Sequence, residues 1–274
     1  MRKFLMVVLF LFPIFTYAQF WEVGTFFGGS NYNGEFVENV IVVKETHPTI
    51  GGVVRLNLSR QFSLKANFYR GKVSGTDQNA KKYFHRSWDR NLHFRSTIFD
   101  IGITPEWNIL GYKTGSFKYH SSPYLFAGVS LFKMNPQAQY NDEWVNLQPI
   151  GTEGQNLSKY EYRKYNLLQF AIPFGFGWKF SVGKNINLGI EASARKTFTD
   201  YLDDVSSYYV DPKDLRLRGG EIAVKLANRT GEVNPEPIEY DEDKLRGSPD
   251  VDDWYYFLGM TITYSFLPIG CISF

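Results

Sequence analysis

Four histidines are the side chains in this sequence best suited to proton transfer at neutral pH: His47, His85, His93 and His120. His93 lies three residues before Ser96, and a histidine beside a serine or a carboxylate can activate a nucleophile, as in some lipid-modifying membrane enzymes. None of the histidines belongs to a recognisable catalytic motif, so exposed or rim histidines are the favoured interpretation. No catalytic residue is predicted, and the protein is not expected to be an enzyme.

Adjacent carboxylates offer a second chemistry. Asp203 and Asp204 could bind calcium, a hard cation that prefers oxygen ligands. They lie in a long acidic connection with neither EF-hand nor nonapeptide spacing, so a solvated acidic loop is the better interpretation. Neither a metal nor another cofactor is predicted.

The positions of these histidines and aspartates depend on the surrounding strands. Eight segments show the two-residue periodicity of a strand with one apolar face. They are residues 21–28, 50–59, 62–69, 96–107, 124–132, 168–180, 186–195 and 254–266. Most are long enough to cross a bilayer at a tilt, which takes about 9–11 residues. A soluble β-sandwich also alternates, but its strands are typically about 5–6 residues long. The pattern therefore predicts an all-β, eight-stranded antiparallel transmembrane barrel.

Composition favours the same fold. The chain has 24 Phe, 18 Tyr and 6 Trp, yet its mean hydropathy is only −0.29. A membrane barrel needs this combination, because its outer face is apolar while its lumen and loops are polar. Aromatic residues at segment ends fit interfacial girdles: Trp21, Phe62, Trp107, Trp178, Tyr264 and Phe266.

The N-terminus predicts export to the outer membrane. Basic Arg2 and Lys3 precede an apolar run over residues 4–15, and Thr16 and Ala18 are small residues at a cleavage site. Residues 1–18 are therefore predicted to be a signal peptide and residues 19–274 the barrel; a retained anchor is the alternative. The single cysteine, Cys271, excludes an intramolecular disulfide.

The predicted connections alternate in length. Those at residues 29–49, 70–95, 133–167 and 196–253 are long, whereas those at 60–61, 108–123 and 181–185 are short. Membrane barrels have long extracellular loops and short periplasmic turns. The first strand is therefore expected to run outward, with both termini in the periplasm.

The polar faces of the segments carry four cations and four anions, which are predicted to be structural lumen charges: Glu22, Arg55, Lys65, Asp100, Glu106, Lys179, Glu191 and Arg195. An eight-stranded barrel is only wide enough for side chains to fill it, and buried charges need partners. We expect ion pairs in a plugged lumen, with a gated pore as the alternative.

Three segments of the sequence resemble a known family. The segments KTFTDYLDDVS (residues 196–206), YVDP (209–212) and DWYYFLGMTITYSF (253–266) resemble the PorG-like outer-membrane barrels of the type IX secretion system of the Bacteroidota. The family supplies no catalytic residues. The resemblance implies a scaffold or anchor beside the periplasmic ring of the secretion and gliding machinery. It also implies that a family-like loop caps the barrel mouth, with residues Thr199, Asp200, Tyr201, Asp203, Asp204, Asp211 and Pro212.

The expected partners are outer-membrane lipid and periplasmic ring proteins. The formal net charge of +2 indicates no nucleic acid. The longest periplasmic turn mixes cations with aromatics and is the candidate ring contact, through Tyr112, Lys113, Phe117, Lys118 and His120; an ordinary solvated turn is the alternative. Two other functions stay open: a generic OmpA-like structural or adhesive barrel, and a lipid-modifying enzyme.

Overall fold

The computed structural model describes residues 20–37, 42–79, 90–234 and 244–266. The predicted signal peptide over residues 1–18, His85 and Cys271 lie outside the described residues. No helix in the described ranges is long and apolar enough to span a bilayer.

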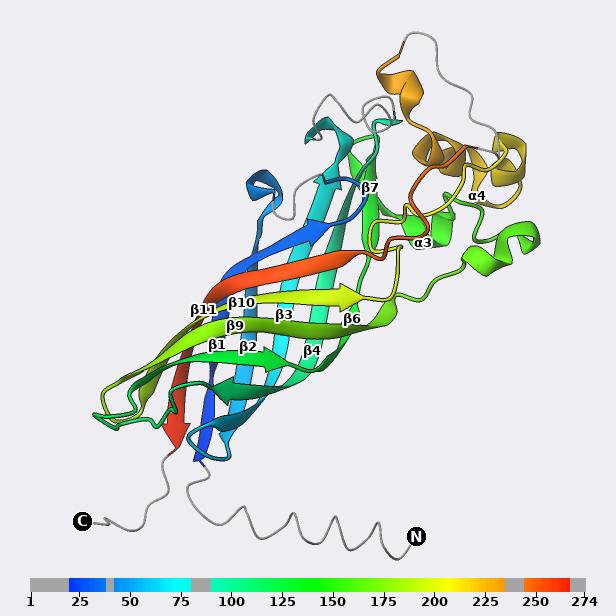
Figure 1. The fold of residues 1–274 in the computed structure, drawn as a ribbon. Helices are drawn as coiled ribbons and strands as arrows, with labels where there is room; N and C mark the ends of the chain where they lie inside the picture. Colours follow the sequence, from blue (N-terminus) through cyan, green and yellow to red (C-terminus); the bar gives the residue numbers. More distant parts are fainter. Residues whose placement is uncertain (1–19, 38–41, 80–89, 235–243, 267–274) are drawn as a thin grey trace, which may run out of the picture.

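The described strands close into a ring (Figure 1). Its members are β1 (Phe20–Asn33), β2 (His47–Asn57), β3 (Phe62–Thr76), β4 (His93–Asn108), β5 (Ser121–Ala127), β6 (Val129–Lys133), β9 (Leu168–Val182), β10 (Ile186–Thr197) and β11 (Trp254–Phe266). Neighbours pair antiparallel, and β1 pairs with β11. Because β5 and β6 share one place between β4 and β9, the ring has eight positions. The predicted barrel is confirmed.

A single glycine divides the fifth position of the ring. Gly128 lies between β5 and β6, and a Cβ there would come 2.1 Å from the backbone oxygen of Ile103. Such a close approach of two strand backbones leaves no room for a side chain. The sequence predicts one strand over 124–132, whereas the structure has two short collinear pieces.

The outer surface of the ring is apolar. Side chains alternate between buried and exposed along each strand, and the exposed members include Val23, Ile101, Phe176, Ile190 and Ile262. The predicted girdle residues are all exposed, and the registers Trp21↔Phe266 and Phe62↔Trp107 put them on one rim. A closed ring with such a surface is the form of an outer-membrane β-barrel. The protein is an outer-membrane β-barrel, as predicted.

The two ends of the barrel differ. Short connections and the two described ends, Phe20 and Phe266, share one end, while the long connections share the other (Figure 1). By the length rule for membrane barrels, the first end is periplasmic and the second extracellular. Several strands run past the membrane: β1, β3 and β4 have 14, 15 and 16 residues.

The extracellular connections contain ordered elements that strand periodicity did not predict. These are β7 (Pro136–Tyr140), β8 (Glu143–Asn146), α3 (Leu147–Ile150), α4 (Pro212–Ala227) and the short 3-10 helices η2 (Val43–Glu45), η3 (Asp77–Asn79), η4 (Ser158–Arg163) and η5 (Thr230–Glu232). Asp211 caps α4 by accepting a hydrogen bond from the backbone nitrogen of Lys213, and Pro212 occupies its first turn. We call the assembly of residues 134–167, 198–234 and 244–253 the lid.

Hydrophobic packing holds the lid together and to the barrel. Val210, Leu215 and Ala223 pack with Tyr160, and Leu226 packs with Leu147 and Ala138. Leu202 and Val205 join the core cluster that includes the strand residues Tyr32, Phe94 and Phe257. The lid is therefore continuous with the barrel core.

Candidate functional site

The barrel lumen holds the eight predicted charges, all of them buried. Glu106 is the hub: its carboxylate is 2.8 Å from Arg55 Nε, 2.5 Å from Lys179 Nζ and 3.7 Å from Lys65 Nζ. The remaining pairs join Arg55 to Glu22 at 2.7 Å, Lys65 to Glu191 at 2.5 Å and Arg195 to Asp100 at 3.5 Å. Every charge predicted to face the lumen thus has an opposite partner inside it.

Neutral side chains donate further hydrogen bonds to these carboxylates. Tyr124 donates to Glu191 at 2.9 Å, Tyr255 donates to Asp100 at 2.8 Å, and Asn57 donates to Glu22 at 2.8 Å. At the level of the Arg195–Asp100 pair, Phe26, Tyr69 and Phe257 pack with ring centroids 4.5–6.5 Å apart. Ion pairs and aromatic rings together fill the interior, the expected condition of an eight-stranded barrel.

The periplasmic turn between β4 and β5 folds back against the barrel end. Tyr112 is 1% exposed and its hydroxyl donates to Asn187 Oδ1 at 2.5 Å; Thr114 donates to the same oxygen at 2.9 Å. Tyr112 therefore anchors the turn and does not belong to an exposed contact surface, contrary to the prediction. Lys113, Phe117, Lys118 and His120 are exposed, with Phe117 at 100%.

Within the described residues, His93 and Ser96 do not form the pair that their spacing suggested. His93 and Ser96 are three residues apart on β4, an odd spacing that places them on opposite faces of the sheet. His93 Nε2 accepts from the backbone nitrogen of Gln139, and Ser96 Oγ accepts from that of Asn135, both at 3.0 Å. His47 Nε2 lies 2.7 Å from Ser74 Oγ, whose hydroxyl donates to Glu45, a pairing that sequence spacing did not indicate.

The first part of the family-like loop, residues 199–204, is largely buried, whereas Asp211 is half-buried and Pro212 is exposed. The prediction of a solvated acidic loop is therefore wrong for Asp203 and Asp204. Asp203 and Asp204 are both fully buried. Asp204 accepts hydrogen bonds from Thr152 at 2.5 Å and from Tyr165 at 2.6 Å. Tyr201 stacks on Tyr165 with ring centroids 4.7 Å apart. The loop packs over the mouth because hydrophobic and hydrogen-bonding side chains of two connections interlock there.

A buried ion pair fixes the centre of the lid. Glu153 accepts from the backbone nitrogens of Ser206 and Ser207 at 2.9 and 3.0 Å, and Arg246 Nη1 lies 2.9 Å from its carboxylate. Arg246 also donates to the backbone oxygen of Asp204 at 2.6 Å. Strand periodicity gives no signal for Glu153 or Arg246, because neither lies in a strand.

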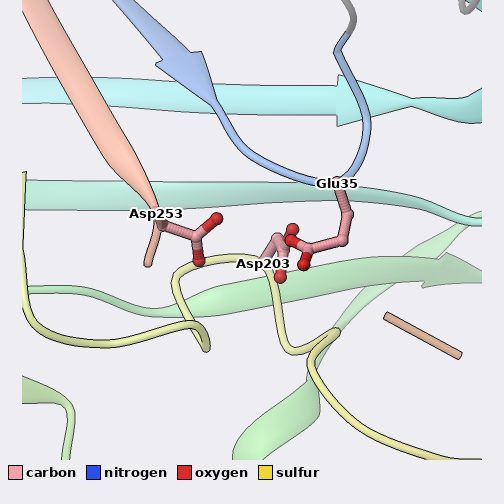
Figure 2. Close-up of side chains that lie close together, drawn as sticks. All are labelled: Glu35, Asp203 and Asp253. Atoms are coloured by element: carbon pink, nitrogen blue, oxygen red, sulfur yellow. The ribbon is translucent and has the colours of Figure 1, made fainter. Parts of the chain in front are cut away.

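Three carboxylates meet beneath the lid. Glu35 follows β1, Asp203 lies in the connection after β10, and Asp253 immediately precedes β11; Figure 2 shows their carboxylates turned toward one another. One oxygen from each lies within 4.8 Å of the others. The Tyr32 hydroxyl donates to Asp203, and its oxygen also lies 3.1 Å from Asp253 Oδ1. We call Glu35, Asp200, Asp203 and Asp253 the acidic cluster.

Burial and mutual repulsion make this cluster difficult to ionise. Burial, followed by the charge of Asp200, raises the pKa of Glu35 to about 8. Burial and the charge of Asp203 raise the pKa of Asp200 to about 8. The pKa values of Asp203 and Asp253 are also raised well above the ordinary range, mainly by burial and then by neighbouring carboxylates. The cluster behaves as a set of like charges in a site of low polarity.

Comparison with known proteins identifies a family. A family described as a domain of unknown function, DUF6089, matches residues 1–225. The chain belongs to the DUF6089 family. The match ends within α4, so this DUF6089 protein has Glu35, Asp200 and Asp203 inside the matched region and Asp253 beyond it. No curated protein is similar enough in sequence to match.

Solved structures of small outer-membrane barrels are weakly similar to this DUF6089 protein. Ail, the attachment invasion locus protein of Yersinia pestis, is 7% identical, with 90% of this chain and 97% of Ail covered at a TM-score of 0.38. Neisserial surface protein A is 8% identical at 90% and 97% coverage, and OprG of Pseudomonas aeruginosa is 7% identical at 92% and 97%, both with a TM-score of 0.41. Similarity at this level supports no inference about function.

Proposed function

We propose that this DUF6089 protein is a non-enzymatic component of the type IX secretion and gliding machinery, in which it anchors the periplasmic ring to the outer membrane. The similarity of residues 196–212 and 253–266 to PorG-like barrels supports this role. The observation that carries it is the filled barrel: paired charges and aromatic rings occupy the lumen. A filled barrel favours interactions at its ends over transport through it.

The proposed ring contact is the periplasmic turn. Phe117 is fully exposed between Lys113 and Lys118, while Tyr112 and Thr114 hold the turn in place from below. An exposed aromatic side chain on a rigid support is the kind of anchor that carries much of the energy in protein interfaces. Cations beside it would favour an acidic partner surface.

The test is co-purification of ring proteins with the tagged barrel from native outer membranes, together with measurement of secreted cargo. We expect Phe117→Ser with Lys118→Glu to insert normally but to lose at least about tenfold in co-purified ring protein, in keeping with the loss of an interface anchor. Val43→Ser, which changes an exposed apolar residue on the extracellular side, is the matched control.

Deletion of the protein separates the alternatives. A secretion defect supports the proposal. Normal secretion with unchanged lipid A would instead indicate a generic OmpA-like barrel, and an altered lipid A mass would indicate an enzyme.

A further inference from the structure

The acidic cluster lacks any cationic partner among the described residues. The two nearest buried arginines are already engaged: Arg90 lies 2.7 Å from Asp77, and Arg246 lies 2.9 Å from Glu153. Buried carboxylates that face one another without a counter-charge are costly. Some external positive charge, either protons or a cation, must therefore compensate them.

Unused ligand atoms point into this site. Both carboxylate oxygens of Asp200 are buried without a hydrogen-bond partner, as is Oε2 of Glu35. Asp200 is only 8% exposed, and its carboxylate lies beside that of Glu35, with which it interacts. Buried polar atoms are nearly always satisfied in folded proteins, which makes these three oxygens candidates for a ligand.

The backbone also leaves room for the cluster. Gly34 lies directly beneath it, and a Cβ at this position would come 2.0 Å from Asp253 Oδ1 and 2.1 Å from the Tyr32 hydroxyl. Only glycine lets the chain after β1 approach so closely. The approach places Glu35 opposite Asp203 and Asp253, which come from two other segments (Figure 2).

We propose that Glu35, Asp203 and Asp253, with Asp200 beside Glu35, form a calcium site that fastens the lid to the barrel mouth. Calcium takes oxygen ligands at about 2.3–2.6 Å, so oxygens on opposite sides of one ion are about 4.6–5.2 Å apart. The oxygens of Glu35, Asp203 and Asp253 lie within 4.8 Å of one another, which is compatible with a shared ion. The site would link the end of β1, the connection after β10 and the start of β11.

Calcium is favoured over magnesium by the donor set. Magnesium demands near-ideal octahedral geometry at about 2.0–2.1 Å and usually keeps several waters. Here carboxylates from three segments converge, and Tyr32, Leu202 and Val205 also hold them by hydrogen bonds. An all-protein cage of carboxylates with flexible spacing is the calcium type.

Calorimetric titration of the folded, metal-stripped barrel in detergent at pH 8 tests the site. We expect one calcium per chain with a dissociation constant on the order of 10⁻⁴ M, in the range of extracellular modules, and weaker binding of magnesium. Asp200→Asn and Asp203→Asn should each weaken calcium binding at least about tenfold. Asp200 interacts with Ser206 and Glu35, and an asparagine amide of nearly the same shape can keep these interactions, so that variant is expected to fold.

Two controls make the outcome specific. Asp250→Asn alters an exposed carboxylate in the same connection as Asp253, and Asp204→Asn alters a buried carboxylate that is already satisfied by Tyr165 and Thr152. Both should keep the affinity. The proposal is overturned if the wild type binds no calcium, which would leave protons as the compensating charge. It is equally overturned if Asp200→Asn and Asp203→Asn bind like the wild type, which would indicate adventitious surface binding. Neither result bears on secretion, so the anchor function is tested independently.

Discussion

The lumen and the acidic cluster solve the same problem, buried charge, in different ways. In the lumen, four cations and four carboxylates neutralise one another at distances of 2.5–3.7 Å. In the cluster, four carboxylates face one another, and no cation of the described ranges pairs with them. The charges of the lumen are neutralised within the chain, whereas the cluster needs protons or cations from the solvent.

This difference assigns the two regions different roles. Pairs fixed inside a closed ring of strands are neutralised within the chain and serve as filling. A cluster with unused oxygens, placed where the lid meets the barrel, responds to cations and to pH. Regulation from the medium is therefore expected at the extracellular mouth and not in the membrane-embedded part.

The largest effect should come from unbalancing the lumen. Glu106→Gln removes the carboxylate that contacts Arg55, Lys65 and Lys179. Because it leaves buried cations without full compensation, we expect it to destabilise the barrel by about 3–5 kcal/mol. Urea unfolding in lipid vesicles measures this change.

Charge balance can be separated from packing by a second substitution. Adding Lys179→Met to Glu106→Gln restores equal numbers of lumen cations and anions, so part of the loss should return. Glu161→Gln, which breaks an exposed pair with Lys164 in the lid, should leave barrel stability unchanged. If the double variant were as unstable as the sum of its single substitutions, balance would not be the stabilising principle.

The contrast between these regions also explains what sequence could predict. Period-two alternation fixes which face each strand residue occupies, and ring closure then brings all inward charges together. Glu22 and Glu106 could therefore be predicted to meet Arg55. The start of α4 also had a signal, because Asp211 and Pro212 form a typical helix N-terminus, but strand periodicity does not detect it.

The acidic cluster could not be predicted by the same means. Glu35, Asp200 and Asp203 lie in connections, where no periodicity relates residues to a face. Their burial arises from contacts far apart in sequence, such as Tyr165 with Tyr201 and Tyr32 with Asp253. The acidic composition of the last connection suggested a solvated loop, because like charges are usually not buried together. The acidic cluster is an exception of the kind expected at a functional site.

In the absence of calcium, the closed lid should become less stable as the pH rises. The pKa of Glu35 and that of Asp200 are each raised to about 8 in the closed lid, from ordinary values near 4, so the closed state holds more protons between these limits. The groups that face them are Asp203, Asp253 and Tyr32, with Arg90 the closest buried cation. The protonated cluster is fully stabilising below about pH 4, and this stability is lost as pH rises through about 8.

One unit of pKa difference corresponds to about 1.4 kcal/mol, so we expect this pH effect to be at least about 2 kcal/mol. Rates of limited trypsin cleavage in the lid report it, because cleavage of a locally opened segment follows the free energy of opening. Calcium should flatten the profile on the alkaline side. A calcium-free profile that is flat between pH 5 and pH 9 would show that the carboxylates are neutralised in some other way.

The smallest expected effect distinguishes the two regions most clearly. Replacing a carboxylate by an amide should destabilise the lumen but stabilise the calcium-free cluster. Amidation of a lumen carboxylate removes attraction, whereas Asp200→Asn in the cluster removes repulsion from Glu35 and Asp203. In calcium-free protein at pH 9 we expect this variant to slow lid proteolysis, corresponding to a stabilisation on the order of 1 kcal/mol. With saturating calcium the order should reverse, because the wild type then gains the energy of a ligand that the variant binds weakly. Asp250→Asn should match the wild type under both conditions. A variant that is less stable than the wild type without calcium would mean that Asp200 has a stabilising partner, and the cluster would then be balanced internally, as the lumen is.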